Sequence, residues 1–219
     1  MARISPSSNP EKEENLVNYV KELQGLNADF MHMDVMDGKF VENTCLNANL
    51  VNEVNKNAVI QLDVHLMVKT PKEHILNYIS AGANIITIHY ESYENITDLL
   101  EDINLIRTTN HTLVGISLKP NTDISVITHI LKLFDLVLIM SVEPGKSGQK
   151  FMEQVLPKIK ELKQEIKNKN LNTLIEVDGG INLNNAKEIV SAGADILVMG
   201  NALYKAENRK EVIDYVHSL

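Results

Sequence analysis

The sequence predicts an α/β fold of the (β/α)8 barrel class, and three features of the chain carry that prediction. Short apolar runs rich in β-branched residues alternate with longer stretches of helical periodicity, and eight such units follow one another within 219 residues. The runs are nearly continuous in apolar character, as in parallel strands buried on both faces. No stretch rich in proline and glycine separates the units, so residues 1–219 are expected to form one domain.

Eight apolar runs are predicted to be the barrel strands: Arg3–Pro6, Phe30–Val35, Val59–Val68, Ile85–His89, Leu113–Leu118, Leu136–Met140, Leu174–Val177 and Ile196–Met199. Helical periodicity between and after them predicts helices at Glu11–Gln24, Pro71–Ser80, Ile96–Thr108, Ile124–Leu133, Met152–Asn168, Asn184–Ser191 and Arg209–Ser218. The connection Leu46–Asn55 is short and rich in asparagine, and its helical pattern is the weakest of the eight.

An internal repeat favours the barrel over a doubly wound open sheet. An open sheet usually has a glycine-rich turn after its first strand, whereas Ile4-Ser5-Pro6-Ser7 stands there. The segment Ser80–Ile86 recurs as Ser191–Leu197, 111 positions later. A polar residue precedes the strand in both copies and at two similar junctions, which predicts a chain built from four quarters; these residues are Asp29, Asn84, Asp135 and Asp195.

Composition and charge limit the classes of partner. The chain has 29 acidic and 21 basic residues, and its formal net charge of -8 argues against a nucleic-acid binder or an anionic-membrane binder. Cys45 is the only cysteine, which excludes an internal disulfide framework. No run approaches 18 uncharged apolar residues and residues 1–10 contain no apolar signal-peptide core, so the cytoplasm is the expected location.

Acidic and imidazole side chains gather at the predicted ends of three strands, where this fold places its chemistry. Residues two apart share one face of a strand, so His32 lies beside Asp34 on the second strand and Asp63 beside His65 on the third. Asp178 ends the seventh strand. A lone strand histidine is most often a core residue, but two His–Asp pairs in matching positions predict a site for a divalent ion such as Zn²⁺, Fe²⁺ or Mn²⁺.

The remaining histidines carry weaker signals. His89 ends the fourth strand and is placed to line a pocket, but it has no carboxylate two residues away within the strand. Four other histidines fall on helices or loops, where surface roles are expected: His74, His111, His129 and His217. Cys45 stands in a predicted loop without a partner cysteine, which argues against a thiol nucleophile.

Glycines cluster after the last three predicted strands. Five of the ten in the chain lie there: Gly145, Gly148, Gly179, Gly180 and Gly200. Loops after the last strands of this fold often bind phosphate through backbone N–H groups, and glycine lets the backbone approach the anion closely. Tight turns also need glycine, but the clustering favours a phosphate site. Net charge describes solubility and long-range steering, so an acidic chain is compatible with such an anionic substrate.

With these residues assembled, the chain closely resembles the ribulose-phosphate 3-epimerases and related sugar-phosphate epimerases, from Ile4 to about Tyr204. Four blocks in the family's order carry the resemblance: His32–Gly38 (HMDVMDG), Leu62–Met67 (LDVHLM), Met140–Gly145 (MSVEPG) and Glu176–Ile181 (EVDGGI). The resemblance implies a single TIM barrel of the ribulose-phosphate-binding type.

The resemblance also implies roles for individual residues. His32, Asp34, His65 and Asp178 match the family's ligands for one divalent metal ion (Zn²⁺, Fe²⁺, Mn²⁺ or Co²⁺), and Asp34 and Asp178 match its acid–base pair. The substrate site that it implies comprises Ser7, Met36, His65, Met67, Met140, Gly145, Lys146, Ser147, Gly148, Gly179, Gly180, Gly200 and Asn201.

Some positions around the expected substrate loops depart from the family's usual residues. Ser8-Asn9 replace aliphatic residues, Glu42 replaces a proline, Lys146-Ser147 replace an aromatic-glycine pair, and Asn201 replaces a small hydroxyl residue. None of them is expected to touch the metal or acid–base residues. Lys146 is expected to add a phosphate contact or to cover the substrate.

The activity implied by the resemblance is the interconversion of D-ribulose 5-phosphate and D-xylulose 5-phosphate, a step of the pentose phosphate pathway. Two carboxylates would exchange the C3 proton on opposite faces of the sugar, and a divalent ion would stabilise the enediolate. The alternative is a D-allulose-6-phosphate 3-epimerase, although such relatives often change the second glycine of Asp178-Gly179-Gly180.

Two other classes fit the sequence less well. An aldolase or decarboxylase on a related barrel usually relies on a lysine at a strand end, where this chain has histidine and aspartate. A non-catalytic sugar-phosphate binder would have lost an acid–base residue. Members of the resembled family form dimers and hexamers, so a homo-oligomer is expected.

Overall fold

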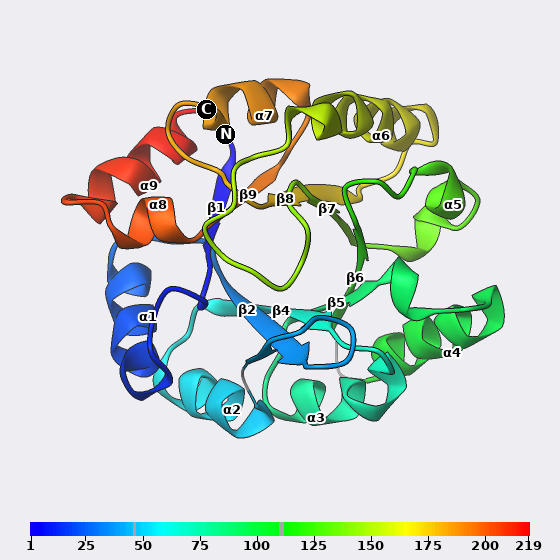
Figure 1. Cartoon of the computed structure of the whole chain (residues 1–219), viewed down its shortest axis with the longest axis horizontal. Coiled ribbons are helices and arrows are strands. Elements are labelled where there is room, and N and C mark those ends of the chain that lie inside the picture. The colour runs from blue at the N-terminus through cyan, green and yellow to red at the C-terminus, as the bar shows by residue number, and fades with distance from the viewer. Residues whose placement is uncertain (46, 110–111) are drawn as a thin grey trace.

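Parallel strands form a ring surrounded by helices in the computed structural model, which describes residues 1–45, 47–109 and 112–219 (Figure 1). The strands are β1 (Arg3–Pro6), β2 (Phe30–Asp37), β4 (Gln61–Met67), β5 (Ile85–His89), β6 (Leu113–Leu118), β7 (Leu136–Met140), β8 (Leu174–Asp178) and β9 (Ile196–Met199). A short β3 (Thr44–Cys45) pairs antiparallel with the end of β2. A parallel bridge between Ser7 and His32 joins β1 to β2 and closes the ring. The predicted (β/α)8 barrel is confirmed.

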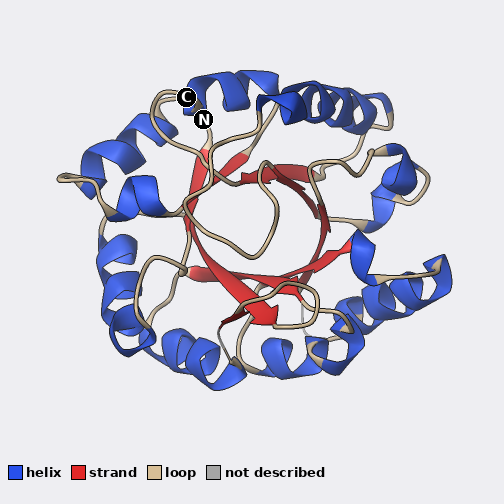
Figure 2. Cartoon of the chain, viewed as in Figure 1, coloured by secondary structure: helices blue, strands red, loops and turns tan. Residues whose placement is uncertain are grey.

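Helices alternate with the strands, as the sequence predicts (Figure 2). They are α1 (Leu16–Gly25), α2 (Ala48–Asn57), α3 (Ile75–Ser80), α4 (Ile96–Arg107), α5 (Ser125–Thr128), α6 (Leu156–Asn168), α7 (Ala186–Ala192), α8 (Asn201–Tyr204) and α9 (Arg209–His217). Four predicted helices include a 3₁₀ turn, at Glu13–Asn15, Pro71–Glu73, Leu131–Leu133 and Glu153–Val155. Among the described residues, no helix has the length and apolar character needed to cross a membrane.

Some elements differ from the prediction. β3 and α8 are not predicted from the sequence, because two and four residues are too short to show a periodic pattern. Cys45 therefore lies in a strand, where a loop is predicted. Leu46, which begins one predicted helix, and His111 lie outside the described residues.

Asparagine side chains cap three of the helices. Asn47, Asn95 and Asn208 stand before α2, α4 and α9. Each accepts a hydrogen bond from the backbone N–H three residues later, at 3.0 to 3.3 Å. The first turn of a helix leaves N–H groups without partners, and an asparagine side chain satisfies one of them. The cap explains how the asparagine-rich α2 forms despite its weak periodicity.

Four polar side chains link neighbouring strands in pairs, and each of them lies just before the second strand of its pair. Asp29, Asn84, Asp135 and Asp195 each precede a strand and accept a hydrogen bond from a backbone N–H of the preceding strand, at 2.8 to 2.9 Å. The backbone N–H of each polar residue also donates to the carbonyl of the residue from which its side chain accepts, at 2.8 to 3.2 Å. The residues that they clamp are Ile4, Leu62, Val114 and Ile175. The repeat seen in the sequence thus corresponds to four β-strand pairs held by the same contact.

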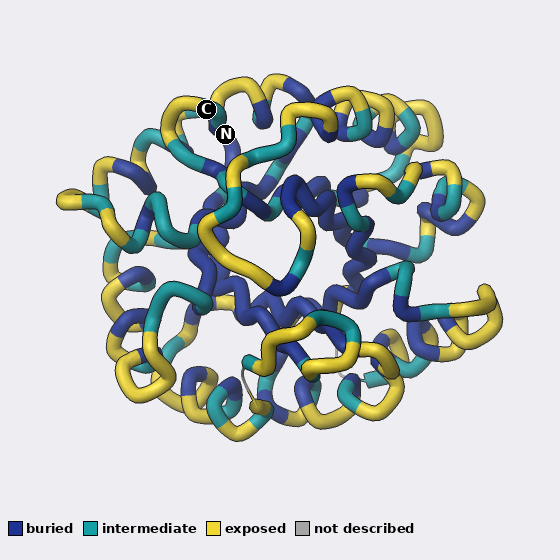
Figure 3. The backbone as a smooth tube through the Cα atoms, viewed as in Figure 1, coloured by how far each residue is buried: buried dark blue, intermediate teal, exposed yellow. Residues whose placement is uncertain are grey.

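The interior of the ring changes from apolar to polar along its axis. Most of the core lies between the strands and the surrounding helices, and it appears as buried segments in Figure 3. Inside the ring, a separate apolar group near the starts of the strands includes Phe30, Ile85, Leu136 and Ile196. The next inward positions on β2, β4, β5 and β8 are the buried polar residues His32, Asp63, Thr87 and Glu176, whereas β7 stays apolar at Leu138 and Met140. Because side chains alternate along a strand, the next inward positions carry the candidate site.

Candidate active site

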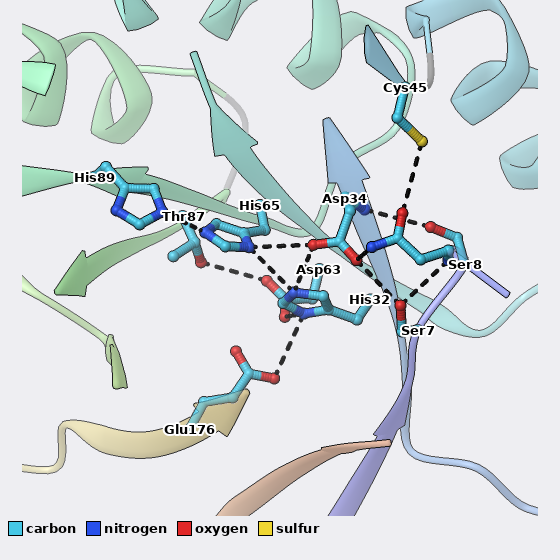
Figure 4. A network of polar contacts seen from close by, with 11 residues as sticks. Ser7, Ser8, His32, Asp34, Cys45, Asp63, His65, Thr87, His89 and Glu176 are labelled. Carbon is cyan, nitrogen blue, oxygen red and sulfur yellow. Dashed lines mark hydrogen bonds and ion pairs between the residues drawn. The ribbon is translucent and has the colours of Figure 1, made fainter. Parts of the chain in front are cut away.

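Four side chains from three strands converge at the carboxyl end of the barrel. His32 and Asp34 come from β2, His65 comes from β4 and Asp178 comes from β8, and one donor atom of each lies within 4.8 Å of the others. Parallel pairing of β2 with β4 places Asp34 beside His65. The structure therefore brings together all four residues that the sequence analysis singled out as metal ligands (Figure 4 shows the two histidines and Asp34).

The donor atoms of this cluster point at a common centre. Asp34 Oδ1 lies 3.2 Å from His65 Nδ1 and 3.4 Å from His32 Nε2, and the two ring nitrogens are 3.3 Å apart. Two imidazole nitrogens and two carboxylate oxygens form a donor set that suits several divalent ions, among them Zn²⁺, Fe²⁺, Mn²⁺ and Co²⁺. The residues present fit the metal that the sequence analysis expects.

A second pair of carboxylates lies beneath the cluster. Asp63 Oδ2 is 2.7 Å from His32 Nδ1, and Glu176 Oε1 is 3.8 Å from the same nitrogen. Both residues are buried, and within the described part of the chain neither oxygen of Glu176 has a hydrogen-bond partner. In the His32 tautomer that donates Nδ1–H to Asp63, the Nε2 lone pair is directed at the cluster, as in many metal-binding histidines.

The cluster is electrostatically strained without a cation. Burial raises the pKa of Asp178 to about 6, and the nearby Asp34 carboxylate adds to the shift. Burial also raises the pKa of Glu176 well above its usual value, reinforced by Asp63. Burial alone would raise the pKa of Asp34, but His32 and His65 outweigh it and hold that pKa low. A dication at the centre would stabilise these buried carboxylates.

A cavity of about 220 Å³ opens above the cluster. Of the residues predicted to bind substrate, it is lined by Ser7, Met36, Met67, Met140, Gly145, Lys146, Ser147, Gly148, Gly179, Gly180, Gly200 and Asn201, together with Asp34 and Asp178. His65 is fully buried and is not part of the cavity lining. The predicted substrate residues other than His65 therefore share one cavity with the two aspartates.

Asn9 makes the contact that the sequence analysis misses. Its Nδ2 donates to Asp34 Oδ2 at 2.8 Å, and the Ser7 hydroxyl donates to the same oxygen at 3.0 Å. The backbone N–H of Asp34 donates to the Ser8 hydroxyl at 3.3 Å. The expectation that Ser8 and Asn9 avoid the acid–base residues is wrong, because the chain after β1 turns over the end of β2 and brings these side chains onto Asp34.

The glycines around the cavity serve different purposes. Gly179 and Gly180 have φ of 127° and 66°, and a Cβ on Gly180 would lie 2.3 Å from the backbone nitrogen of Phe151. The turn alone requires glycine at these two positions. Gly200 has φ of -94°, and an added Cβ would meet nothing closer than 3.6 Å. Packing therefore does not exclude a side chain at Gly200, and its backbone lies open to the cavity.

Comparison with known proteins assigns the chain to a family. The model of the Ribulose-phosphate 3 epimerase family matches residues 3–204, which include every residue of the cluster. The chain belongs to the ribulose-phosphate 3-epimerase family.

Individual relatives agree with this assignment. The chain is 39% identical to the ribulose-phosphate 3-epimerase of Bacillus subtilis, over 99% of this chain and 98% of that enzyme. It is 38% identical to the chloroplastic ribulose-5-phosphate-3-epimerase of Arabidopsis thaliana, over 96% of this chain and 74% of the plant protein. The ribulose-phosphate 3-epimerase of Escherichia coli K12 is 36% identical, over 87% of this chain and 84% of its own.

Solved structures share the fold at much lower identity. The 3-hexulose-6-phosphate synthase of Salmonella typhimurium superposes with a TM-score of 0.69 at 14% identity, covering 99% of this chain and 97% of that one. Tryptophan synthase of Pyrococcus furiosus superposes with a TM-score of 0.70 at 13% identity, covering 99% and 98%. These structural similarities support the barrel architecture of this chain.

Lys146 and Glu42, two residues expected from the sequence to depart from the family's pattern, face each other across the two loops at the mouth of the cavity. Lys146 Nζ is 3.2 Å from the carboxylate of Glu42, and both side chains are mostly exposed. The neighbouring Asn43 side chain donates to the Gly145 carbonyl at 2.6 Å. The loop between β2 and β3 therefore contacts the glycine-containing loop after β7, which Figure 1 shows lying across the barrel mouth.

His89 has a carboxylate partner just beyond its strand. Its Nδ1 lies 3.0 Å from Glu91 Oε2, and Glu91 belongs to the 3₁₀ turn Tyr90–Ser92 that follows β5. A carboxylate therefore does stand two residues after His89, but it lies in the turn that follows the strand, where the chain bends back toward the barrel. The sequence places His89 where it would line the pocket. In the structure His89 is instead fully buried beside His65 and is not among the residues that line the cavity.

Glu91 is expected to make the metal-free protein acid-sensitive. Burial alone would raise its pKa, but His89 and hydrogen bonds from Thr122 and the Lys119 backbone lower the pKa to about 2; Lys158 faces it from α6. The unfolded chain takes up this proton near pH 4.3. Ionised Glu91 thus contributes to the free energy of unfolding above about pH 4.5, and this contribution disappears toward pH 2. It amounts to roughly 1 to 3 kcal/mol.

Urea unfolding of the metal-free wild type and of Glu91→Gln between pH 7 and pH 2 measures this contribution. The difference in unfolding free energy is expected to be constant from pH 7 to about pH 5 and to shrink below it. A difference that does not change with pH would contradict the assignment of an ionised Glu91.

Proposed function

We propose that the chain is a metal-dependent epimerase that interconverts D-ribulose 5-phosphate and D-xylulose 5-phosphate. The relatives named above carry this activity in their names, and one observation of the site supports it most directly. Asp34 and Asp178 reach the same cavity from β2 and β8, on different sides of the barrel mouth, and both belong to the candidate metal cluster. Two carboxylates placed in this way can act on opposite faces of one carbon atom.

The chemistry requires two proton-transferring groups. Inversion at C3 removes the proton next to the C2 carbonyl and returns a proton to the opposite face. Each aspartate acts as base in one direction and as acid in the other. Ser7 and Asn9 orient Asp34 through Oδ2, which leaves Oδ1 facing the cluster. The four residues would hold a divalent ion, which would supply positive charge to stabilise the enediolate.

The rest of the cavity suits the remainder of the substrate. Met36, Met67 and Met140 line it near the aspartates and present thioether surfaces that can pack on a planar enediolate without donating hydrogen bonds. The glycine-containing loops after β7, β8 and β9 lie along the same cavity, and the open backbone at Gly200 gives a phosphate group close approach.

Proton exchange in D₂O tests the proposed function. The metal-loaded protein is incubated with D-ribulose 5-phosphate or with D-allulose 6-phosphate, and deuterium entry at C3 is followed by NMR. We expect exchange and conversion to D-xylulose 5-phosphate with the pentose. Exchange with neither sugar would exclude the epimerase proposal, and exchange with the hexose alone would favour the allulose-6-phosphate enzyme.

Lys146 is proposed to contact the substrate phosphate. Lys146→Ala is expected to raise KM by about two- to fivefold at low ionic strength while kcat stays nearly constant, because exposed ion pairs are weak and screened by salt. Glu42→Gln is the matched variant, since it removes the partner of Lys146 but keeps the lysine. Steady-state kinetics distinguish a phosphate contact of Lys146 from a loop contact with Glu42. Equal increases in KM for both variants would indicate the loop contact, and unchanged kinetics in Lys146→Ala would exclude both roles.

Three broader expectations are also proposals. A continuous core that runs from Ala2 to Val216 supports a single domain over residues 1–219. Partly exposed apolar side chains at Leu76 on α3 and at Ile96 and Leu100 on α4 are compatible with a homo-oligomer, a dimer or a hexamer, which light scattering can count. The acidic composition and the phosphorylated ketose substrate are compatible with a cytoplasmic enzyme that binds neither nucleic acid nor membrane.

A further inference from the structure

A chain of hydrogen bonds runs from the candidate metal cluster to a carboxylate that the proposed reaction does not use. His89 Nε2 lies 2.8 Å from His65 Nε2, and His89 Nδ1 lies 3.0 Å from Glu91 Oε2 (Figure 4 shows the two histidines). His89 and His65 are both fully buried, and their rings are 4.9 Å apart between centroids. His65 is thus connected to Glu91 through one intervening imidazole.

The hydrogen bonds on Glu91 fix it as an acceptor. Its Oε1 accepts the backbone N–H of Lys119 at 2.7 Å and the hydroxyl of Thr122 at 2.5 Å, while Oε2 faces His89. The shared hydrogen bonds favour the ionised form, in agreement with the lowered pKa of this carboxyl group. An ionised carboxylate has no proton to donate.

That acceptor sets the direction of the bond between Glu91 and His89. Because Glu91 only accepts, Nδ1 of His89 must carry a proton. In the His89 tautomer protonated only at Nδ1, Nε2 is bare and accepts, so Nε2 of His65 is the donor in the 2.8 Å contact between the two rings. The remaining nitrogen of His65, Nδ1, is the one that lies 3.2 Å from Asp34 Oδ1 in the metal cluster.

The other histidine of the cluster is held by a matching but shorter arrangement. His32 Nδ1 lies 2.7 Å from Asp63 Oδ2, which directs Nε2 into the cluster. His32 therefore offers Nε2 and His65 offers Nδ1, so opposite ring nitrogens meet at the same centre. Asp63 orients His32 directly, whereas His65 is reached from Glu91 through His89.

We propose that His89 and Glu91 are positioning residues that hold His65 in the tautomer presenting Nδ1 to the divalent ion. The proposal rests on the metal site of the proposed function and specifies how that site is built. Partners that orient a ligating histidine typically affect metal affinity by about 10- to 100-fold, and loss of this relay is expected to have an effect of that size.

Nitrogen-15 NMR of the imidazoles in the metal-free protein tests the relay without metal or activity. Chemical shifts distinguish a protonated ring nitrogen from a bare one, and His89→Phe and His65→Phe assign the signals. We expect His89 to be protonated at Nδ1 and bare at Nε2, and His65 to be protonated at Nε2. A His89 ring protonated at Nε2 and bare at Nδ1 would overturn the proposal.

Metal affinity provides the second readout. Glu91→Gln keeps the shape of the side chain but removes the obligate acceptor, and it is expected to weaken Co²⁺ and Zn²⁺ binding by about 10- to 100-fold and to change the Co²⁺ absorption spectrum. Glu94→Gln is the matched control, because it makes the same change at an exposed carboxylate outside the relay, and its affinity is expected to stay within about threefold. His89→Phe keeps the buried ring and removes both nitrogens, and it is expected to behave like Glu91→Gln.

The outcomes separate this proposal from the proposed function. Wild-type affinity in both Glu91→Gln and His89→Phe would overturn the relay even if the protein were an active epimerase. Equal weakening in Glu94→Gln would also overturn it, since the effect would then not depend on the contact between Glu91 and His89. A wild-type protein that binds no divalent ion would remove the metal from the proposed function, and the tautomers of the metal-free protein would still decide how His65 is held.

Discussion

Replacing Asp178 with asparagine is expected to lower the rate of epimerisation by about 10³-fold or more. General acid–base groups contribute about 10² to 10⁴ in rate, and the proposed inversion uses both carboxylates in every turnover. The amide side chain of the variant would keep an oxygen beside the cluster but could not remove or return a proton. Epimerisation is measured by coupled assay or NMR, with metal content determined on the same sample, because Asp178 is also one of the four candidate ligands.

The two-base scheme gives this variant a specific signature. Asp34 remains able to remove and return a proton on its own face, so Asp178→Asn in D₂O is expected to exchange the C3 hydrogen of one of the two sugars without converting it. Asp34→Asn should show the same behaviour with the other sugar. Glu188→Gln, a charge-matched change on an exposed residue of α7, is the control and should leave the rate unchanged. Epimerisation within tenfold of wild type in Asp178→Asn would exclude its catalytic role.

The cluster could be predicted because it depends on rules that operate within a strand and between neighbours. Alternation along β2 puts His32 and Asp34 on one face, and parallel pairing repeats that pattern beside Asp63 and His65 on β4. The fold was predictable for a similar reason, since Asn84 and Asp195 reappear at equivalent junctions and make the same contact with the preceding strand. Short-range periodicity carries both kinds of information.

Contacts made by loops that return over the barrel mouth could not be predicted in this way. Asn9 reaches Asp34 only because the segment after β1 bends across β2, and no spacing in the sequence records that bend. Glu91 is a partial exception, because it continues the i+2 spacing from His89. The strand ends at His89, so the 3₁₀ turn that follows, and not alternation along a strand, keeps the two side chains together.

Removal of the metal is expected to abolish activity and to lower thermal stability together. The cluster brings Asp34 and Asp178 within 4.8 Å of two imidazoles, with two further buried carboxylates, Asp63 and Glu176, below it. An ion that binds only the folded state stabilises it by mass action, by about 4 kcal/mol when the free ion is at 1,000 times its Kd. For a chain of this size each kcal/mol corresponds to roughly 2 to 4 °C in Tm, so chelation is expected to lower Tm by roughly 8 to 16 °C.

Scanning calorimetry and activity assays on chelated and reloaded protein test this together. The mixed nitrogen and oxygen donors predict that more than one of Zn²⁺, Fe²⁺, Mn²⁺ and Co²⁺ restores both activity and Tm. His32→Ala, which lacks one donor, should start from a lower Tm and respond far less to added metal. If chelation abolished activity but left Tm unchanged, the ion would have to arrive with the substrate, and the four side chains of the cluster would not be its resident ligands. If activity survived complete removal of metal, the two aspartates would have to stabilise the enediolate without a Lewis acid, which their mutual repulsion in the buried cluster opposes.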